Sequence, residues 1–357
     1  MPKLETGLDS VRRGDFSLSL CSRAVLWCLA VVCLSGCQSV AYYTQAAVGQ
    51  SALLWQSRPI DEVIRDPKTS DPLRDRLRFV ESVRDYAESE LFLPATGSYR
   101  RFTDIGRDFV LWSVVAAEEF STEPKLFCHP ITGCVAYQGY FDRVDALAFA
   151  EGLESTGYET AVGPVAAYST LGWFADPVLS SVLHYPDTQL AELIFHELAH
   201  ELLFVPGDTT FNESFATFVA RAGVEQWLTD SGRTATLEEF KADAVRHDKT
   251  VNLIRDTRLA LGELYARSIT QVDMRLQKRM MLDELVEDYR KFRKTSLVSN
   301  WDGWFEEGLN NAKLASVGSY HDDIDLFASL FEKADHDFEV FYFSVRALAA
   351  SRNAAQD

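Results

Sequence analysis

Two histidines one helical turn apart, His196 and His200, form the pattern in this chain that is best suited to chemistry. Residues four apart on an α-helix lie about 40° apart around the axis, so both imidazoles can reach one small cation. Neutral imidazole suits zinc, and a catalytic zinc takes three protein ligands and leaves one position for water. Glu197 follows the first histidine, where it can take a proton from that water without occupying the metal. The pattern predicts a hydrolytic zinc site, the alternative being a coincidence on an exposed helix.

Glu213, thirteen residues after His200, is the candidate third ligand. A second helix is predicted to begin with Asn212 as its N-cap, which places Glu213 in the first helical turn. A short chain reversal would bring that turn back against the first helix, and Ala216 would allow a close approach. The alternative is that Glu213 only stabilises the dipole of its own helix. The need of zinc for a third ligand favours the metal-binding role.

Two amphipathic helices are expected to position these four residues. The first is predicted over residues 188–205, with Pro206 and Gly207 ending it and the site residues off its apolar face. That face consists of Leu190, Leu193, Ile194, Leu198 and Leu202. The apolar face of the second helix consists of Phe215, Phe218, Val219 and Ala222. A short turn between two such helices would bring the candidate ligands together.

The remaining chain divides into three kinds of segment. Residues 42–90 have helical spacing, and short β-rich runs broken by glycine and proline predict a small α/β lobe over residues 91–183. A strand is expected late in that lobe, over residues 158–173. Its part at residues 165–171 is either an edge strand that pairs with an extended substrate or an ordinary sheet strand. Residues 253–293 are rich in helix formers, with candidate buried positions at Leu259, Leu261, Leu264, Leu276, Leu282 and Leu285.

The N-terminus has the order of parts of a secretion signal. Basic residues precede an apolar run at residues 24–34, which is too short to cross a bilayer. Leu34-Ser35-Gly36-Cys37 resembles the lipobox of bacterial lipoproteins, which implies cleavage before Cys37 and a lipid on that cysteine. Gln38 implies, by the same resemblance, sorting to the outer membrane. The alternative is an ordinary signal anchor with a chance cysteine, and acidic residues before the apolar run leave the true start codon open.

Two of the six cysteines, Cys128 and Cys134, lie outside the signal segment and the lipobox. In an oxidising compartment a pair this close, bracketing Pro130 and Gly133, predicts a disulfide that closes a turn. The rival interpretation is a metal site that includes His129. Two cysteines and one histidine make an incomplete ligand set, which favours the disulfide.

The composition bounds the partners of the chain. Its 357 residues carry a formal net charge of -18 that is spread along the sequence. Such a surface repels phosphate backbones, and no stretch combines a basic run with interleaved aromatic residues. Nucleic acid is therefore not an expected partner.

A family resemblance joins these observations. The stretches Phe-His-Glu-Leu-Ala-His at residues 195–200, Gly-Asp-Thr at 207–209 and Phe-Asn-Glu-Ser-Phe-Ala-Thr-Phe-Val at 211–219 carry it. With them the chain resembles the predicted zinc aminopeptidases of proteobacteria, periplasm-facing lipoproteins within the gluzincin class. The resemblance covers most of the chain after the signal, and extends to residues 133–137, 168–174, 310–312 and Tyr320. It implies a peptide substrate, one zinc ion and attachment to a membrane through Cys37.

The chain departs from the well-studied gluzincin aminopeptidases in two ways. The interval between His200 and Glu213 is shorter, and the Gly-x-Met-Glu-Asn motif that binds a substrate amine is absent. These two departures leave specificity for the N-terminus of a substrate undecided. They do not affect the prediction of metallopeptidase chemistry. The candidate carboxylates for binding an amine are Glu118, Glu119 and Asp176, each of which is otherwise ordinary surface.

A stabilising group for the oxyanion is expected opposite the zinc. Tyr320 and, less strongly, His321 follow a possible turn at residues 316–319, where a phenol or imidazole could serve this purpose. The alternative is that Tyr320 is a packing residue beside a turn. The other histidines, His129, His184, His247 and His336, have no partner spacing and are assigned to structure or surface.

The expected fold is α+β: a mainly helical, zincin-like metallopeptidase with a small mixed sheet lobe and a helical C-terminal region. The expected parts are a signal peptide at residues 1–36, a helical segment at 37–95, the sheet lobe and zinc-binding helices at 96–235, and a helical region at 236–357. The sequence predicts a lipid-anchored zinc peptidase at the periplasmic face of the outer membrane, with aminopeptidase activity favoured. The alternatives are an envelope endopeptidase for protein quality control and a non-catalytic scaffold with a structural zinc, for which Glu197 would not be needed.

Overall fold

The computed structural model describes residues 40–129, 133–167, 170, 174–294, 301–317 and 323–356, with side chains of the last helix up to residue 352. The chain divides into two compact units, residues 1–48 and residues 49–357. Residues 40–48 of the first unit are helical, and all elements named below belong to the second. None of the helices in the described ranges combines the length and apolar character that a membrane crossing requires.

A small sheet and two helices open the second unit. Strand β1 (Arg58–Pro59) pairs antiparallel with β2 (Arg101–Thr103), which pairs in parallel with β8 (Val178–Leu179). Helix α2 (Ile60–Arg65) and helix α3 (Asp71–Ser89) lie between β1 and β2 in the chain. The apolar face of α3 packs into the main core, and its fully buried members are Leu77, Val80, Val83 and Ala87. The helices predicted before residue 90 are therefore present.

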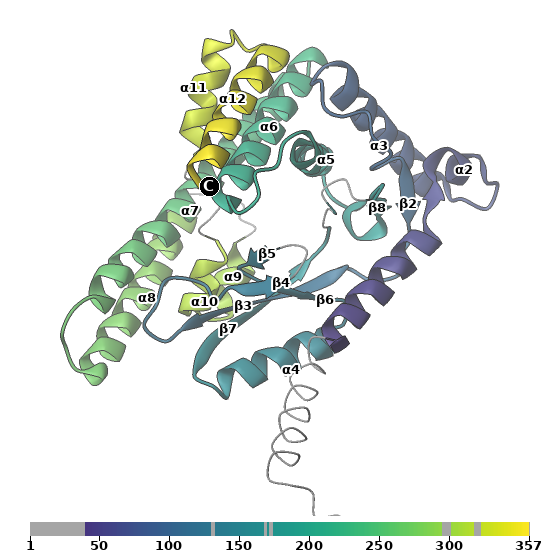
Figure 1. The fold of residues 1–357 in the computed structure, drawn as a ribbon. Coiled ribbons are helices and arrows are strands. Elements are labelled where there is room, and N and C mark those ends of the chain that lie inside the picture. Colours follow the sequence, from purple (N-terminus) through teal and green to yellow (C-terminus); the bar gives the residue numbers. More distant parts are fainter. Residues whose placement is uncertain are drawn as a thin grey trace, which may run out of the picture. The chain divides into compact units, whose positions relative to one another are not determined.

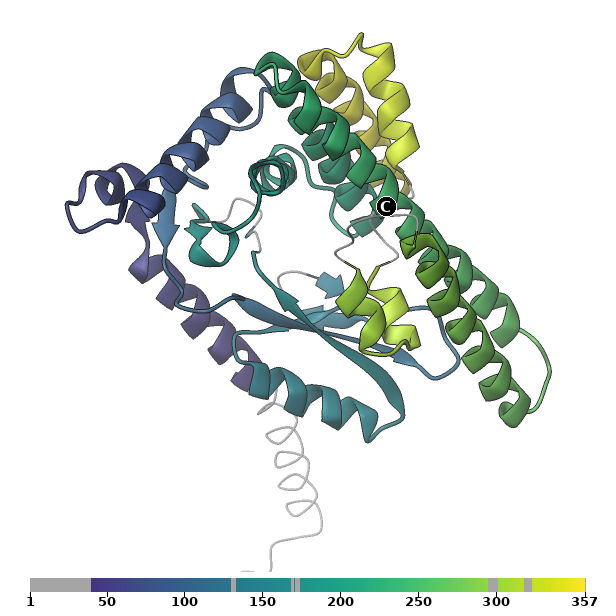
Figure 2. The same ribbon diagram turned by 180° about the vertical axis from the view of Figure 1, so that it is seen from behind.

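The predicted α/β lobe is built around strand β3 (Leu111–Glu118), which lies between β6 (Gln138–Tyr140) and β7 (Tyr158–Val165). Both neighbours run antiparallel to β3, and the pairing with β7 extends from Leu111 opposite Val165 to Glu118 opposite Tyr158. Helix α4 (Arg143–Glu154) lies on one face of this sheet and α10 (Asn311–Ala315) on the other (Figures 1 and 2). Residues 114–117 of β3 are all buried, as a strand covered on both faces requires.

The edge strand predicted for substrate pairing is shorter than expected. Strand β7 is an edge strand of its sheet, but it ends at Val165. Ala166 and Ala167 belong to no strand, and Ser181 Oγ donates a hydrogen bond to the carbonyl of Ala166. The prediction of a strand through residue 173 is therefore wrong for these two residues, while Tyr168, Ser169 and residues 171–173 lie outside the described chain.

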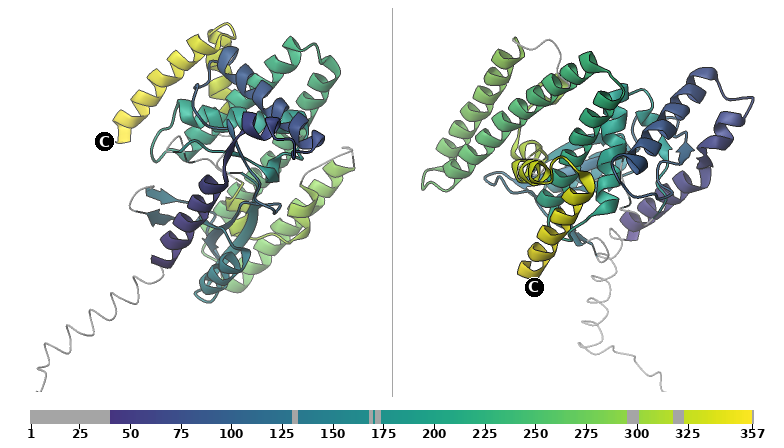
Figure 3. Two further views of the ribbon diagram at one scale, coloured as in Figure 1. Left: turned by 90° about the vertical axis from the view of Figure 1, so that its right-hand side faces the viewer. Right: turned by 90° about the horizontal axis from the view of Figure 1, so that it is seen from above.

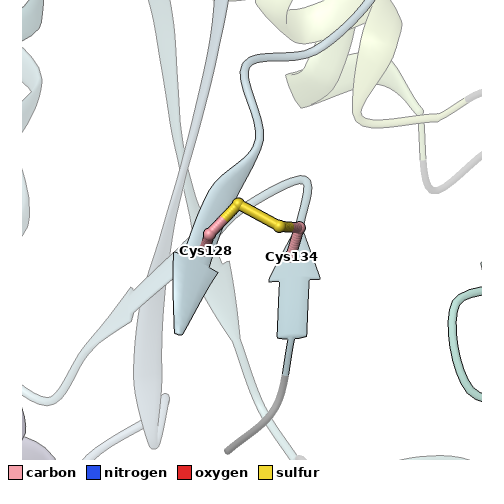
Figure 4. The surroundings of a disulfide bond; sticks show 2 residues. All are labelled: Cys128 and Cys134. Atoms are coloured by element: carbon pink, nitrogen blue, oxygen red, sulfur yellow. A yellow bond between two sulfur atoms is a disulfide. The ribbon is translucent and has the colours of Figure 1, made fainter. Parts of the chain in front are cut away.

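Strands β4 (Phe127–His129) and β5 (Gly133–Val135) form a separate hairpin. Cys128 lies directly opposite Cys134 in the register, and a disulfide joins them across the two strands (Figure 4). Gly133 has φ +72°, a left-handed backbone that glycine adopts without steric conflict. The predicted disulfide is therefore present, and it closes the hairpin.

Four helices contribute most of the aromatic residues of the main core. Helices α5 (Asp187–Leu202) and α6 (Thr209–Asp230) pack against each other, and α11 (Ile324–Lys333) and α12 (Phe338–Gln356) cover α6 (Figure 1). A cluster of aromatic rings fills the interface of α6 with α11 and α12. Its members are Phe211, Phe215, Phe218, Phe327, Phe331, Phe341 and Tyr342. This cluster fixes the position of α6, and with it the candidate third ligand.

Helices α7 (Thr234–Tyr265) and α8 (Gln271–Arg293) form a long hairpin that is seen from above in Figure 3. Helices α7 and α8 share a second apolar core, and the short helix α9 (Asp302–Glu306) contributes Phe305 to it. Of the leucines predicted to be buried, Leu261, Leu264, Leu282 and Leu285 are, but Leu259 is 64% exposed and Leu276 is 57% exposed. Leu259 lies two residues, about 200°, from Leu261 around the helix, so the two cannot share one face.

Candidate metal centre

Helix α5 presents His196 and His200 because its other faces are held in the core. Leu190, Ile194, Phe195 and Leu198 are fully buried. The helix ends at Leu202, three residues before the predicted end, because Leu203 adopts an extended backbone with φ −153°. The prediction of a helix through Val205 is therefore wrong, and residues 203–208 form the whole connection to α6.

The side chain of Asn212 fixes the connection between α5 and α6, which differs from its predicted role as an N-cap. Asn212 is not the N-cap of α6: the helix begins earlier, and Asp208 caps it by accepting a hydrogen bond from the Phe211 N–H at 3.0 Å. Asn212 is buried and bonds to both backbone groups of Val205 instead, accepting from its N–H at 2.7 Å and donating to its carbonyl at 2.8 Å. Gly207 supplies the left-handed residue of the turn, with φ +81°.

Glu213 consequently lies in the second turn of α6, one position after Asn212, and faces α5. Its Oε2 is 3.4 Å from His196 Nε2 and 3.6 Å from His200 Nε2, and the two Nε2 atoms are 3.1 Å apart. Ligand atoms about 2.0–2.1 Å from a tetrahedral zinc lie about 3.3 Å from one another. The three atoms therefore form a triangle of the size that one zinc ion requires, and the three residues could hold a metal ion.

The electrostatics of this triangle fit a cation. Burial on its own would raise the pKa of Glu213, yet the two imidazoles together hold it at about 2. Burial opposes protonation of His196, but Glu213 and Glu197 together raise its pKa. The carboxylates thus favour positive charge between these residues, which a metal ion supplies when both imidazoles are neutral.

Glu197 lies beside the triangle in a different environment. Burial raises the pKa of its carboxyl group, while His196 and His200 act in the opposite direction. Tyr99 and Asp176 are close enough to interact with it electrostatically. The Tyr99 hydroxyl is buried and has no hydrogen-bond partner among the described residues. This arrangement gives Glu197 a raised proton affinity, which suits a general base.

A cavity of about 660 Å³ opens onto the site. Its wall includes one candidate ligand, His196, and the candidate base, Glu197, while His200 and Glu213 lie behind this wall. The rest of the wall comes from helices α5, α6, α7 and α8 and from residues 185, 301, 316 and 317. The volume is that of a few amino-acid residues, within the usual range for binding sites of small molecules.

The model of a protein family described as "Putative aminopeptidase" matches residues 41–357. The chain belongs to this family. Comparisons with curated proteins and with solved structures give no match. The aminopeptidase family accounts for nearly the whole length of the chain, so its description applies to the part that contains the cavity and the three candidate ligands.

The candidate amine-binding carboxylates of this aminopeptidase-family chain do not meet at the cavity wall. Glu119 forms a bidentate ion pair with Arg275 on α8, with contacts of 2.5 and 2.8 Å. Glu118 ends strand β3. Asp176 is buried and accepts hydrogen bonds from the backbone and hydroxyl of Thr170. Asp176 lies near Glu197, but none of the three lines the cavity.

Other predicted residues lie outside the described chain. These are Tyr320 and His321, the candidates for stabilising an oxyanion, and Cys37, the candidate lipid site. His247, assigned from sequence to structure or surface, lines the cavity with Trp301, whose ring centroid is 5.4 Å from its own.

Two residues near the site were not singled out from the sequence. Glu192 precedes His196 by one helical turn and lines the cavity, and this spacing was a signal that could have identified it. Tyr99 lies in the loop after α3, where the fully buried Arg84 donates hydrogen bonds to the carbonyls of Pro94, Thr96 and Ser98. Nothing local in the sequence connects that loop with Glu197.

Proposed function

We propose that the protein is a zinc-dependent peptidase that removes residues from the N-terminus of peptides. The observation that carries the proposal is the triangle of His196, His200 and Glu213, of which His196 lines a peptide-sized cavity together with Glu197. Membership of the aminopeptidase family supports the substrate class and the exopeptidase specificity.

The residues divide the chemistry between them. His196, His200 and Glu213 would hold the zinc, which polarises water and the scissile carbonyl when it is bound. Glu197 takes a proton from the attacking water and passes it to the departing amine. The burial that raises the pKa of Glu197 makes the carboxylate a better proton acceptor than an exposed glutamate.

We also propose that the enzyme works at the periplasmic face of the envelope, held by a lipid on Cys37. The signal-like N-terminus and its lipobox support this placement. The disulfide between Cys128 and Cys134 is consistent with it, because such bonds persist in oxidising compartments.

The deciding experiment offers the zinc-loaded protein one peptide in two forms, with a free and with an acetylated N-terminus, and identifies the products by mass. An aminopeptidase shortens the free form one residue at a time and cleaves the acetylated form far more slowly. Internal cuts in both forms at similar rates would replace the aminopeptidase by an endopeptidase. A protein that binds zinc and cleaves neither form would be a scaffold with a structural metal.

A further inference from the structure

The cavity wall carries one carboxylate that the proposed mechanism does not use. Glu192 lies on α5 four residues before His196, so its Cα is about 6 Å from that of His196 along the helix axis. Both side chains line the cavity together with Glu197. Glu192 therefore faces the same space as the candidate ligand His196, one helical turn away from it.

The half-buried carboxylate of Glu192 has one loose ionic contact and no hydrogen bond within the described chain. Its nearest cationic group is Arg221, whose Nε is 4.0 Å from Oε1, beyond hydrogen-bond distance. Arg221 directs two hydrogen bonds to Asp248, at 2.8 and 3.1 Å. No described residue donates a hydrogen bond to the carboxylate of Glu192. Burial raises its pKa, against the opposing effects of Arg221 and His196.

The other acidic side chains of the cavity already have a catalytic role or an ion-pair partner. Three carboxylates line it, those of Glu192, Glu197 and Asp243. Glu197 is the proposed base, and Asp243 forms an ion pair with Arg246 one turn along α7. Glu192 is thus the carboxylate in this wall that can accept a further cation.

We propose that Glu192 binds the free α-ammonium group of the substrate, and so confines cleavage to the N-terminal residue. This inference rests on the proposed peptidase function. The α-nitrogen of the first residue is two bonds from the scissile carbonyl carbon. When that carbonyl lies at the metal site, the ammonium group remains within reach of a carboxylate one helical turn away. A charge-assisted hydrogen bond then pairs the ammonium group with a carboxylate that accepts no hydrogen bond from the described residues of the free protein.

The first test compares the rates of hydrolysis of a tetrapeptide with a free N-terminus and of its acetylated form. The wild-type protein is expected to prefer the free peptide, and Glu192→Gln to reduce kcat/KM for that peptide by about 10- to 100-fold without affecting the acetylated one. Asp243→Asn is the matched control, because it removes the same charge from the same wall and is expected to keep the ratio of the two rates. Glu192→Asp is expected to retain part of the preference.

A binding measurement separates this inference from the proposed function. Calorimetry on zinc-loaded Glu197→Gln protein, which should not turn over, is expected to show tighter binding of the free peptide than of the acetylated one. The double variant Glu197→Gln/Glu192→Gln is expected to bind both equally. A preference for the free peptide that survives Glu192→Gln, in rate or in binding, overturns the inference while leaving the peptidase intact. Absence of any preference in the Glu197→Gln protein overturns it as well.

Discussion

Asn212 holds the backbone of Val205 from across the turn between α5 and α6, with hydrogen bonds of 2.7 and 2.8 Å to its N–H and carbonyl. The next residue along α6 is Glu213, the candidate third ligand, and the helix before Val205 carries the two histidines. The amide therefore sets the distance between the two parts of the metal site, although its hydrogen bonds go to Val205 and not to the ligands. The sequence predicts Asn212 to be the N-cap of α6, but Asp208 has that role and Asn212 joins the two sides of the turn.

Replacing Asn212 by alanine is expected to destabilise the fold and loosen the site. Two buried backbone groups of Val205 lose their partners, so the free energy of unfolding should fall by about 2–3 kcal/mol. Displacement of Glu213 should weaken zinc binding by about 10- to 100-fold. Chemical denaturation and a competitive zinc titration measure these effects. Asn252→Ala, at an exposed position of α7, should change neither, and a wild-type affinity in Asn212→Ala would contradict this account.

The purified protein is expected to bind one zinc ion, and His196→Ala or His200→Ala to lose it, because two ligands do not hold a catalytic zinc firmly. Elemental analysis after dialysis measures the stoichiometry. His184→Ala is the matched control, since this exposed histidine lies before α5 and outside the triangle. Full zinc occupancy in the His196→Ala/His200→Ala double variant would remove the basis of the site.

Glu197→Gln should separate metal binding from hydrolysis. The amide has nearly the shape of the carboxylate but cannot accept the proton, so zinc content should stay the same while kcat falls by about 100- to 10,000-fold. Glu201→Gln, one turn further along α5, is a useful comparison: its carboxylate accepts a hydrogen bond from Thr96 at 2.7 Å and is expected to matter far less for the rate. Peptide cleavage by Glu197→Gln at the native rate would show that another residue is the base.

The parts of this site that could be predicted are those that depend on one helix. The spacing of His196 and His200 is set by helical geometry alone, so their convergence follows from the sequence. Glu213 was the right candidate for the third position of the triangle, but its place in the second turn was not foreseen, because that depends on where Asp208 rather than Asn212 caps the helix. The cavity was not predictable either, since its wall combines α5 and α6 with α7 and α8 from far along the chain.

The proposed lipid anchor has its own test. Cys37→Ser should abolish labelling of the protein by a fatty-acid analogue, because the modified sulfur is gone, and should leave an uncleaved or released form. Cys134→Ser is the control, since the disulfide hairpin is separate from the N-terminus in sequence and its loss should not affect labelling. Continued labelling of Cys37→Ser would refute the lipobox interpretation.

The last prediction concerns the contact that lets α6 lie against α5. Gly223 is in the middle of α6, and a Cβ added there would be 2.6 Å from Leu91 Cδ1 and 3.1 Å from Phe195 Cδ2, both closer than ordinary contact. Phe195 precedes His196 on α5 and is fully buried, so it has little room to move. Gly223→Ala should therefore displace α6 from Leu91, which follows α3, and from Phe195 on α5.

Gly152 in α4 offers the matched comparison, because a Cβ there would meet nothing within 4 Å. Gly152→Ala should raise the free energy of unfolding by up to about 1 kcal/mol, since alanine is the better helix former. Gly223→Ala gains the same helix propensity, yet overpacking should outweigh it and lower the free energy of unfolding by about 1–3 kcal/mol. Zinc affinity should fall in Gly223→Ala but not in Gly152→Ala, because only the Cβ at position 223 would displace α5, the helix that carries the histidines. Equal stabilisation by both substitutions would show that the approach of α6 to α5 is not tight, and that the ligand distances are maintained by the turn at Asn212 without help from Gly223.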